Sequence, residues 1–284
     1  MTLRKHENLF RFSVTQEQQI VNLYINNISI SKIAKLYKAD RDTITRIIKK
    51  NNINVRKYNY LRKHPLNEHY FDNIDSQDKA YFLGLLYADG CNHFDDKRKK
   101  VSISLQEEDA DILRKFSNYL YNIEFLQFLK GRDSNKNQIR LTIHSRKISQ
   151  VLNNLGCTSQ KSLKLKAPIW LTNPDLQRHF IRGYFDGDGC LSKYQHRKSY
   201  AYKWTLISTQ EFCEWVANIL KTNLSIHVSQ KLTCPKTDNK ITHTISVSGN
   251  QQIIKLLDWL YKNSFLHLNR KFQKFQQLKS LYYI

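Results

Sequence analysis

The sequence predicts an α+β protein built from two copies of one helix-and-strand unit and preceded by an all-α segment. A nine-residue motif with glycine at its third and ninth positions and aspartate at its eighth occurs twice in the chain. Each copy is followed by segments in which apolar and polar residues alternate, which is typical of half-buried strands. Before the first copy, apolar residues follow the spacing of helices instead.

The composition favours an anionic partner. The 284 residues include 46 Lys and Arg against 24 Asp and Glu, so the formal net charge is +22 at pH 7. This favours nucleic acid, ahead of an anionic membrane. No apolar stretch approaches the roughly 20 residues that span a bilayer, and no secretory signal is present. Five cysteines without CxxC spacing favour reduced thiols. We expect a protein that is not secreted and lies in the cytoplasm or an organelle, wherever its DNA is.

Residues 1–55 are predicted to form a helix-turn-helix domain. Three helical patterns lie between Val14 and Asn51, with a tight turn at 38–39 and Asp40 as N-cap of the third helix. Such a helix enters the major groove of DNA. Its outward side would present Arg41, Thr45, Arg46, Lys49 and Lys50. The alternative is a three-helix module with a solvated basic face. Residues 29–50 resemble the helix-turn-helix of resolvases and transposases, although the glycine often found in that turn is absent. Residues 56–72 are predicted to be a basic linker.

The two motifs read FLGLLYADG (Phe82–Gly90) and IRGYFDGDG (Ile181–Gly189). Each is predicted to end a helix, with Asn173 as N-cap of the second helix and residue 75 or 76 as cap of the first. We expect the final glycine of each motif to take a left-handed cap conformation. The interior glycines Gly84 and Gly183 lower helix stability by about 1 kcal/mol each relative to alanine. Their matched positions therefore predict close packing of the two helix backbones.

Parallel packing of these helices would bring Asp89 and Asp188 together at two negative helix ends. That arrangement is electrostatically unfavourable, and a divalent cation would resolve it. Mg²⁺ prefers oxygen ligands and keeps several waters, and such a metal can activate water for phosphodiester hydrolysis. The alternative is that both residues are ordinary acids at helix ends, but the repeated spacing argues against it.

Four segments show the alternation of half-exposed antiparallel strands. Their apolar residues are Val101, Ile103 and Leu105; Ile139, Leu141 and Ile143; Ile226 and Val228; and Ile241, Ile245 and Val247. The polar faces can reach base edges in a DNA groove. The candidate DNA contacts in this part of the chain are Arg140, Thr142, His144, Lys203 and Lys231.

The paired motifs, with the approach NEHYFDNIDSQDKAYFLGLLYADG to the first, resemble those of the single-chain LAGLIDADG homing endonucleases. The resemblance implies two pseudo-twofold αββαββα repeats, here residues 73–166 and 167–284, whose antiparallel strands form a DNA-binding saddle. It implies a monomer that cleaves double-stranded DNA at a long asymmetric target. Mg²⁺ would serve as cofactor, with Ca²⁺ or Mn²⁺ as substitutes.

The resemblance also assigns residues. Asp89 and Asp188 match the family's metal-binding acids, with Ala88 and Gly187 beside them as candidate metal ligands. Lys161 and Lys271 are candidates for a catalytic lysine near the cleavage site, and solvated surface lysines are the alternative. Weaker candidates for holding metal-bound water are Gln106 or Glu107 and Thr209 or Gln210. At the motif's sixth position, Tyr87 replaces the common acid and Asp186 keeps it, and this residue usually caps or packs.

The function that we expect is site-specific DNA cleavage of the intron-homing kind. Because residues needed for protein splicing are lacking at both ends, we expect a free-standing enzyme. Two alternatives remain open at this point. One is a transcription regulator that keeps the fold without cleavage, and the other is an RNA maturase.

Overall fold

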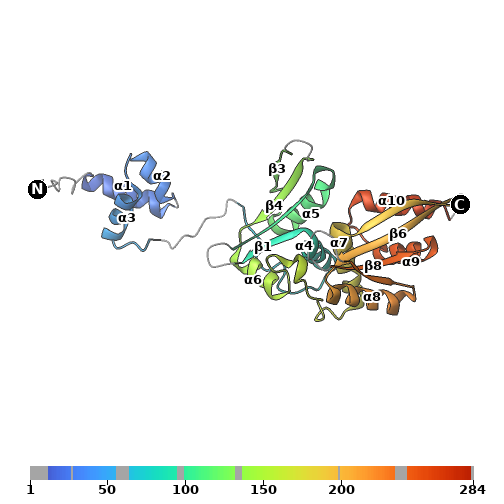
Figure 1. Cartoon of the computed structure of the whole chain (residues 1–284). Helices are drawn as coiled ribbons and strands as arrows, with labels where there is room; N and C mark the ends of the chain where they lie inside the picture. Colours follow the sequence, from blue (N-terminus) through green and yellow to red (C-terminus); the bar gives the residue numbers. More distant parts are fainter. Residues whose placement is uncertain are drawn as a thin grey trace, which may run out of the picture. The chain divides into compact units, whose positions relative to one another are not determined.

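A computed structural model describes residues 12–26, 28–55, 64–94, 99–131, 136–197, 199–233 and 242–282. The chain divides into two compact units, Met1–Lys63 and His64–Ile284. Each unit has an apolar core of its own, and Figure 1 shows the helices and strands of both.

The described part of the first unit consists of three helices. They are α1 (Val14–Ile25), α2 (Ile30–Leu36) and α3 (Arg41–Lys50). The side chains of Ser13 and Ser29 accept hydrogen bonds from the first turns of α1 and α2, which stabilises both helix starts. Asp40 precedes α3 as predicted, but its side chain makes no capping hydrogen bond. Lys38 has a φ of 48° in the turn before α3, so a lysine takes the left-handed conformation where glycine is more usual.

The second unit begins with one helix-and-strand repeat. Its elements are α4 (Gln77–Asp89), β1 (Gly90–Phe94), β2 (Lys99–Gln106), α5 (Ala110–Tyr121), β3 (Gln127–Leu129), β4 (Gln138–Ile143) and α6 (Arg146–Asn154). Two short 3₁₀ turns, η1 (Glu107–Asp109) and η2 (Lys161–Leu163), precede α5 and follow α6.

The same order of elements then recurs. The second repeat contains α7 (Pro174–Asp188), β5 (Cys190–His196), β6 (Ser199–Ser208), α8 (Gln210–Leu224), β7 (Ser229–Thr233), β8 (Thr242–Ser248) and α9 (Asn250–Tyr261). A further helix, α10 (Asn269–Ser280), is the last element of the second repeat. The first repeat has no counterpart of α10, because only the short η2 turn lies between α6 and α7. This arrangement confirms the predicted α+β class.

Each repeat contains a four-stranded antiparallel sheet, with strand orders β1-β2-β4-β3 and β5-β6-β8-β7. Pairing places Ile103 opposite Leu141 in the first sheet and Leu206 opposite Ile245 in the second. These apolar residues are buried under α5 and α6 in the first repeat and under α8 and α9 in the second (Figure 1). The other face of each sheet is therefore left without covering helices from its own repeat.

One local expectation about the strands was inaccurate. The strand expected from Ile226 begins only at Ser229, although Ile226 and Val228 are buried before it. Ile241 lies outside the described residues, and β8 begins at residue 242. The sequence interpretation also missed β1, β3, β5 and β6. Apolar edge residues such as Phe128 stay 56% exposed, so alternation in β3 does not report burial.

The expectation of left-handed glycine caps was wrong. Gly90 has φ −72° and ψ 144°, and Gly189 has φ −79° and ψ 158°, which is extended backbone that any residue adopts. Glycine is required there by space instead. A Cβ on Gly90 would lie 2.5 Å from the carbonyl oxygen of Leu86, and one on Gly189 would lie 2.0 Å from Cδ2 of Phe185. The chain therefore leaves each helix directly into a strand.

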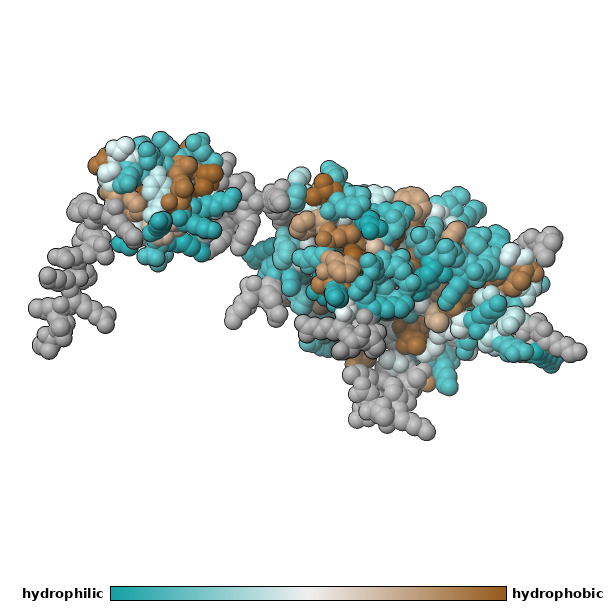
Figure 2. Space-filling view, turned by 90° about the horizontal axis from the view of Figure 1, so that it is seen from above, coloured by the Kyte–Doolittle hydropathy of each residue, from teal (hydrophilic) through white to brown (hydrophobic). Residues whose placement is uncertain are grey.

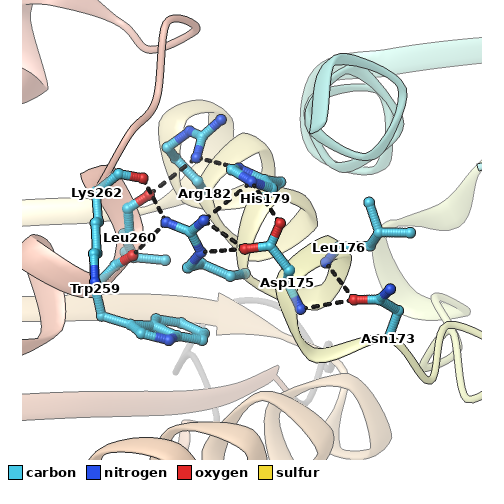
Figure 3. Close-up of polar contacts among 9 residues, drawn as sticks. Asn173, Asp175, Leu176, His179, Arg182, Trp259, Leu260 and Lys262 are labelled. Atoms are coloured by element: carbon cyan, nitrogen blue, oxygen red, sulfur yellow. Dashed lines mark hydrogen bonds and ion pairs between the residues drawn. The ribbon is translucent and has the colours of Figure 1, made fainter. Parts of the chain in front are cut away.

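Two arginines of α7 hold the C-terminal end of α9 (Figure 3). Arg178 donates to the carbonyls of residues 259 and 262 at 3.1 and 2.6 Å. Arg182 donates to those of residues 260 and 266 at 3.0 and 2.9 Å. Carbonyls at a helix end lack intrahelical partners and carry partial negative charge, so the arginines satisfy both needs. His179 accepts a hydrogen bond from Arg182 at Nδ1 (2.5 Å). This cluster fixes α7 relative to the end of α9 within the second repeat.

Most of the face shown in Figure 2 is hydrophilic, with hydrophobic residues in separate patches. The longest apolar stretch of the sequence, residues 80–88, lies in α4 and is almost entirely buried. No helix within the described ranges is long and apolar enough to cross a membrane.

Candidate functional site

Helices α4 and α7 lie side by side between the two sheets and run parallel, so that their C-terminal ends meet (Figure 1). A Cβ on Gly84 would lie 2.0 Å from the carbonyl oxygen of Phe180, and one on Gly183 would lie 2.0 Å from that of Tyr81. The same motif positions meet in both directions, as a local twofold relation produces. The backbones thus approach as closely as glycine permits, and this contact places the ends of both helices together.

Asp89 and Asp188 are the last residues of these helices, and both side chains are exposed to solvent. Desolvation by the surrounding helix ends, followed by the charge of Asp188, raises the pKa of Asp89 to about 6. Desolvation also raises the pKa of Asp188. Since the charge of one carboxylate acts on the other, the two lie within short electrostatic range. The structure therefore brings together two acids that are 99 positions apart in the sequence.

The chain around these acids supplies oxygen donors. A Cβ on Gly187 would lie 2.8 Å from Oδ2 of Asp89 and 2.3 Å from Cβ of Ala88, so Gly187 and Ala88 touch beside the carboxylates. Among the described residues, no cluster of three or more His, Cys, Asp or Glu side chains could hold a metal ion. Two carboxylates with nearby carbonyls fit Mg²⁺, which binds oxygen and completes its shell with water or phosphate. A divalent cation would also offset the repulsion by Asp188 that contributes to the raised pKa of Asp89.

Lys161 and Lys271 are both buried, with 8% and 4% of their surface exposed. The alternative of solvated surface lysines was therefore wrong. The Lys161 ammonium donates to the carbonyl of Gly90, and the Lys271 ammonium donates to that of Gly189 at 2.5 Å. Lys271 also donates to the carbonyls of residues 185 and 186. Burial lowers the pKa of Lys271 to about 8. Both ammonium charges act on the two carboxylates and lower their pKa values.

The sixth motif positions have structural roles. The Asp186 carboxylate accepts hydrogen bonds from the hydroxyls of Tyr81 (2.8 Å) and Tyr261 (3.2 Å) and from the backbone N–H of Leu268 (2.9 Å). Tyr87 donates its hydroxyl to the carbonyl of Leu155. Tyr87 therefore ties α4 to a later segment of its own repeat, and Asp186 ties α7 both to α4 of the first repeat and to later segments of the second. Both side chains are buried away from the joined helix ends.

Sequence reasoning missed Tyr184, which lies one helical turn before Asp188. Its hydroxyl is 2.9 Å from Oγ of Ser208, and hydrogen bonding by this tyrosine lowers the pKa of Asp188. Leu85 holds the matching position in the first motif. The spacing of four residues was the available signal, because residues four apart meet on one helix face.

The predicted strand contacts differ in exposure. Lys203 and Lys231 are exposed on the outward face of the second sheet, and His144 is exposed just after β4. Arg140 is partly buried, and its Nε donates to Oγ of Ser104 at 2.8 Å. Thr142 is only 9% exposed, contrary to the expectation of an exposed side chain. Four of the five candidates thus lie at a solvent-facing surface.

The candidates of α3 lie on its solvent side, where Arg41, Arg46, Lys49 and Lys50 are exposed. Thr45 is partly buried and donates its hydroxyl to the Arg41 carbonyl at 2.7 Å. The Lys50 ammonium lies 2.8 Å from Oε2 of Glu17 in α1. Lys50 therefore already contributes to the first unit's own structure.

The weaker candidates for water binding have other partners. The Thr209 hydroxyl donates to the carbonyl of Leu165 at 2.6 Å and caps α8. Gln106 and Glu107 accept hydrogen bonds from Lys136 and Asn137, and Gln210 donates to Glu214 at 2.8 Å.

Part of the chain matches a known family. Residues 175–259, less than a third of the chain, match the model of the family described as LAGLIDADG-like domain. This segment contains most of α7, including the second motif, and extends into α9.

Two curated proteins match with low identity. The DNA polymerase of Acanthamoeba polyphaga mimivirus is 28% identical over 134 residues, which cover 45% of this chain and 8% of the polymerase. The replication factor C small subunit of Methanocaldococcus jannaschii is 23% identical over 184 residues, which cover 64% of this chain and 9% of that protein. The chain thus matches less than a tenth of the length of either relative.

Several solved structures show a weaker likeness. A structure of mesophilic variants from the homing endonuclease I-DmoI has a TM-score of 0.45 and 20% identity, covering 69% of this chain and all of that one. I-GzeII in complex with its DNA target has 0.45 and 12%, covering 71% and 89%. I-WcaI bound to its DNA recognition sequence has 0.46 and 16%, covering 75% and 91%. I-DmoI has also been solved with DNA and Mn. Because these TM-scores are below 0.5, the likeness carries no conclusion about the activity of this chain.

Proposed function

We propose that this protein is a sequence-specific, metal-dependent endonuclease for double-stranded DNA. The observation that carries the proposal is the meeting of Asp89 and Asp188, both exposed, at the joined ends of two parallel helices. The pKa of each carboxylate is raised. Ordinary surface acids at helix ends would not be expected to show this rise. The match of residues 175–259 to the LAGLIDADG-like domain supports the same proposal.

The chain's own residues would divide the work. Asp89 and Asp188 would hold Mg²⁺, with the carbonyls of Ala88 and Gly187 as further candidate ligands. A bound divalent cation supplies an activated water and charge stabilisation for phosphodiester hydrolysis. Lys161 and Lys271 hold the residue that follows each carboxylate, Gly90 or Gly189, through its carbonyl, and their positive charges favour the ionised carboxylates. The acids are thereby kept ready to bind metal.

DNA would lie against the outward faces of the two sheets. Lys203, Lys231 and Arg140 offer charge and hydrogen-bond donors there, and polar side chains such as Ser104 alternate with them. The exposed basic residues of α3 would contact DNA as a helix-turn-helix does. A formal charge of +22 is consistent with many phosphate contacts, each of which releases counterions. The protein would act as a monomer, because one chain carries both motifs.

The first test needs a target. Duplexes that bind the full chain are selected from a random pool and cloned into a supercoiled plasmid. Incubation with Mg²⁺ should give linear plasmid, and EDTA should prevent it. A duplex that binds tightly but is never cut in Mg²⁺ or Mn²⁺ would instead indicate a transcription regulator.

The second test addresses the metal ligands. Asp89→Asn and Asp188→Asn should each abolish cutting while the Kd for the selected duplex stays within a few-fold. Asp258→Asn is a matched control, because Asp258 pairs with Lys279 away from both motif ends (2.5 Å), and it should cut normally. Normal cutting by either motif variant would refute the metal assignment.

A further inference from the structure

An ion pair joins the two repeats beside the candidate metal centre. Arg270, in the first turn of α10, donates from Nε to Oδ2 of Asp109 at 2.9 Å. Asp109 closes the η1 turn of the first repeat, and only 3% of its side chain is exposed. The Arg270 side chain is 43% exposed. A buried carboxylate of one repeat thus fixes one end of an arginine from the other, while the rest of that arginine reaches solvent.

This guanidinium lies within electrostatic reach of Asp89. The charge of Arg270, together with those of Lys271 and Lys161, lowers the pKa of Asp89. Its neighbour Lys271 is anchored on the carbonyl of Gly189, directly after Asp188. Arg270 is therefore held at the edge of the centre where the two carboxylates meet.

The terminal nitrogens of Arg270 remain available. Within the described part of the chain, the pair with Asp109 is the guanidinium's hydrogen-bonded contact, and it uses Nε. An arginine has five N–H donors, four of them on the two terminal nitrogens. These donors match the geometry of a phosphate group, which arginine binds in a bidentate manner.

The matching position in the first repeat has no such charge. Lys161 occupies the place of Lys271, and the residue before it is Gln160, which has a left-handed φ of 52°. The first repeat also has only the short η2 turn where the second has α10. The centre is thus pseudo-symmetric in its acids and lysines but not in this arginine.

We propose that Arg270 is a catalytic residue that binds the phosphodiester at one of the two cleavage positions and that Asp109 positions it there. This inference rests on the proposed nuclease function. During hydrolysis a water molecule gives up a proton to solvent as its oxygen forms a bond to phosphorus, the bond to the leaving sugar oxygen breaks, and that oxygen takes up a proton from solvent. Negative charge grows on the phosphoryl oxygens, and the guanidinium stabilises this charge while keeping its own protons. Because Gln160 offers no equivalent, the two strands are cut at different rates.

A binding experiment tests the phosphate contact without any cleavage. Selected duplexes carry a neutral methylphosphonate at one central phosphate at a time, and Kd is measured in EDTA. At one phosphate, neutralisation should weaken wild-type binding at least about tenfold. Binding by Arg270→Ala should weaken less than about twofold at that phosphate, because this variant has already lost the charge-assisted pair that neutralisation removes. Arg114→Ala is the matched control, because Arg114 pairs with Glu124 on the surface at 3.5 Å, and it should keep the wild-type profile. If Arg270→Ala also keeps that profile at every phosphate, the contact does not exist.

A cleavage experiment tests the catalytic role. With each strand labelled separately in Mg²⁺, Arg270→Ala should slow one strand by about 10²–10³-fold, as the loss of one stabilising donor does elsewhere, and leave the other within about threefold. Nicked plasmid should accumulate. Arg270→Lys should restore little, because an ammonium does not bind in a bidentate manner. Asp109→Asn should slow the same strand by a smaller factor. Equal slowing of both strands, or none, would overturn the proposal.

The two failures can be told apart. If the wild-type protein cuts no selected duplex, the proposed nuclease function and the catalytic role both fall, while the methylphosphonate profile still reports whether Arg270 contacts phosphate. Urea unfolding of each variant, compared with Arg114→Ala, shows whether the loss of the pair between the repeats has altered the fold.

Discussion

The Nζ atom of Lys271 lies 2.5 Å from the carbonyl oxygen of Gly189, the residue that follows Asp188. Lys161 makes the corresponding hydrogen bond to the carbonyl of Gly90, which follows Asp89. Both lysines are buried, so each bond replaces the water that both groups lose on folding. The first residue after each carboxylate is thereby fixed by a lysine from a later segment of the same repeat.

The two lysines should differ in their contribution to stability. Lys271 donates to the carbonyls of residues 185, 186 and 189, whereas Lys161 donates to one carbonyl within the described part of the chain, that of Gly90. Lys271→Met should lower the free energy of unfolding by about 1–3 kcal/mol and by more than Lys161→Met. Urea denaturation measures both, with the exposed Lys274 of α10 changed to Met as control. An equal or reversed order would show that the extra carbonyl bonds contribute nothing.

The interior glycines of the motifs should tolerate no side chain. In Gly84→Ala or Gly183→Ala the new Cβ would lie 2.0 Å from a backbone oxygen of the facing helix, so the helices must separate. We expect a loss of about 3 kcal/mol or more and, where the variant folds, loss of metal-dependent cutting. Gly249→Ala is the control. A Cβ at this position would meet no atom closer than 3.5 Å, but the residue has a φ of 89°. The free energy of unfolding should therefore fall by only about 1 kcal/mol. A loss no larger than that of the control would contradict close packing.

How far the sequence predicts this structure depends on repetition. Asp89 and Asp188 could be placed together because two identical spacings imply two identical helices, and helices with matched glycines pack together. The strands around Ile103 and Leu141 could be predicted because one face is buried and the other is wet. By contrast, β5 contains consecutive polar residues, and its partner in the sheet decides its structure.

Contacts that occur only once in the chain could not be predicted. Nothing in the sequence near Arg270 points to Asp109, which precedes it by 161 positions. The burial of Arg182 could not be predicted either, because a charged guanidinium is normally exposed. Its desolvation is compensated here by hydrogen bonds to carbonyls of α9 and of the loop that follows it. The glycines that end the motifs were assigned the wrong cause for a similar reason, since a short distance to Phe185 or Leu86 is invisible until the helix has folded.

Removing one carboxylate charge should stabilise the metal-free protein. Desolvation by burial, followed by the charge of Asp188, raises the pKa of Asp89 to about 6, so the ionised Asp89 is held unfavourably at neutral pH. In EDTA, Asp89→Asn should therefore raise the free energy of unfolding, by at most about 1 kcal/mol because both side chains reach solvent and water screens them. Added Mg²⁺ should raise the melting temperature of the wild type but not of the variant. Residues selected only for stability would give the opposite sign in EDTA.

Stability should fall in weak acid partly through His179. Burial and then the charges of Arg182 and Arg178 lower the pKa of His179 from 6.5 to about 4. Between these values the unfolded chain binds more protons than the folded chain, so stability rises with pH across this window. The contribution is complete above about pH 6.5 and is lost as pH falls toward 4, and it is on the order of 1–3 kcal/mol.

The variant His179→Gln isolates this contribution. Glutamine cannot take up a proton, so the free energy of unfolding measured by urea between about pH 7 and pH 4.5 should fall less steeply than in the wild type. The difference between the two curves cancels the other titrating groups that are unaffected by the change. Parallel curves would mean that His179 is protonated in the folded protein.

Lys49 and Lys50 should affect DNA binding and stability in different proportions. Both are exposed at the end of α3, but Lys50 already pairs with Glu17 of α1 at 2.8 Å. If Lys49 contacts a phosphate, Lys49→Ala should weaken binding of the selected duplex and reduce the slope of log K against log salt concentration by about 0.9. It should leave the stability of the first unit unchanged.

Lys50→Ala should lower that stability by a few tenths of a kcal/mol, as loss of an exposed ion pair does, and Glu17→Gln should lower it equally. Because Glu17→Gln frees the ammonium of Lys50 for phosphate, this variant should bind DNA at least as tightly as the wild type. Binding that weakens equally in Lys50→Ala and Glu17→Gln would show instead that the ion pair maintains the DNA-binding surface of α3.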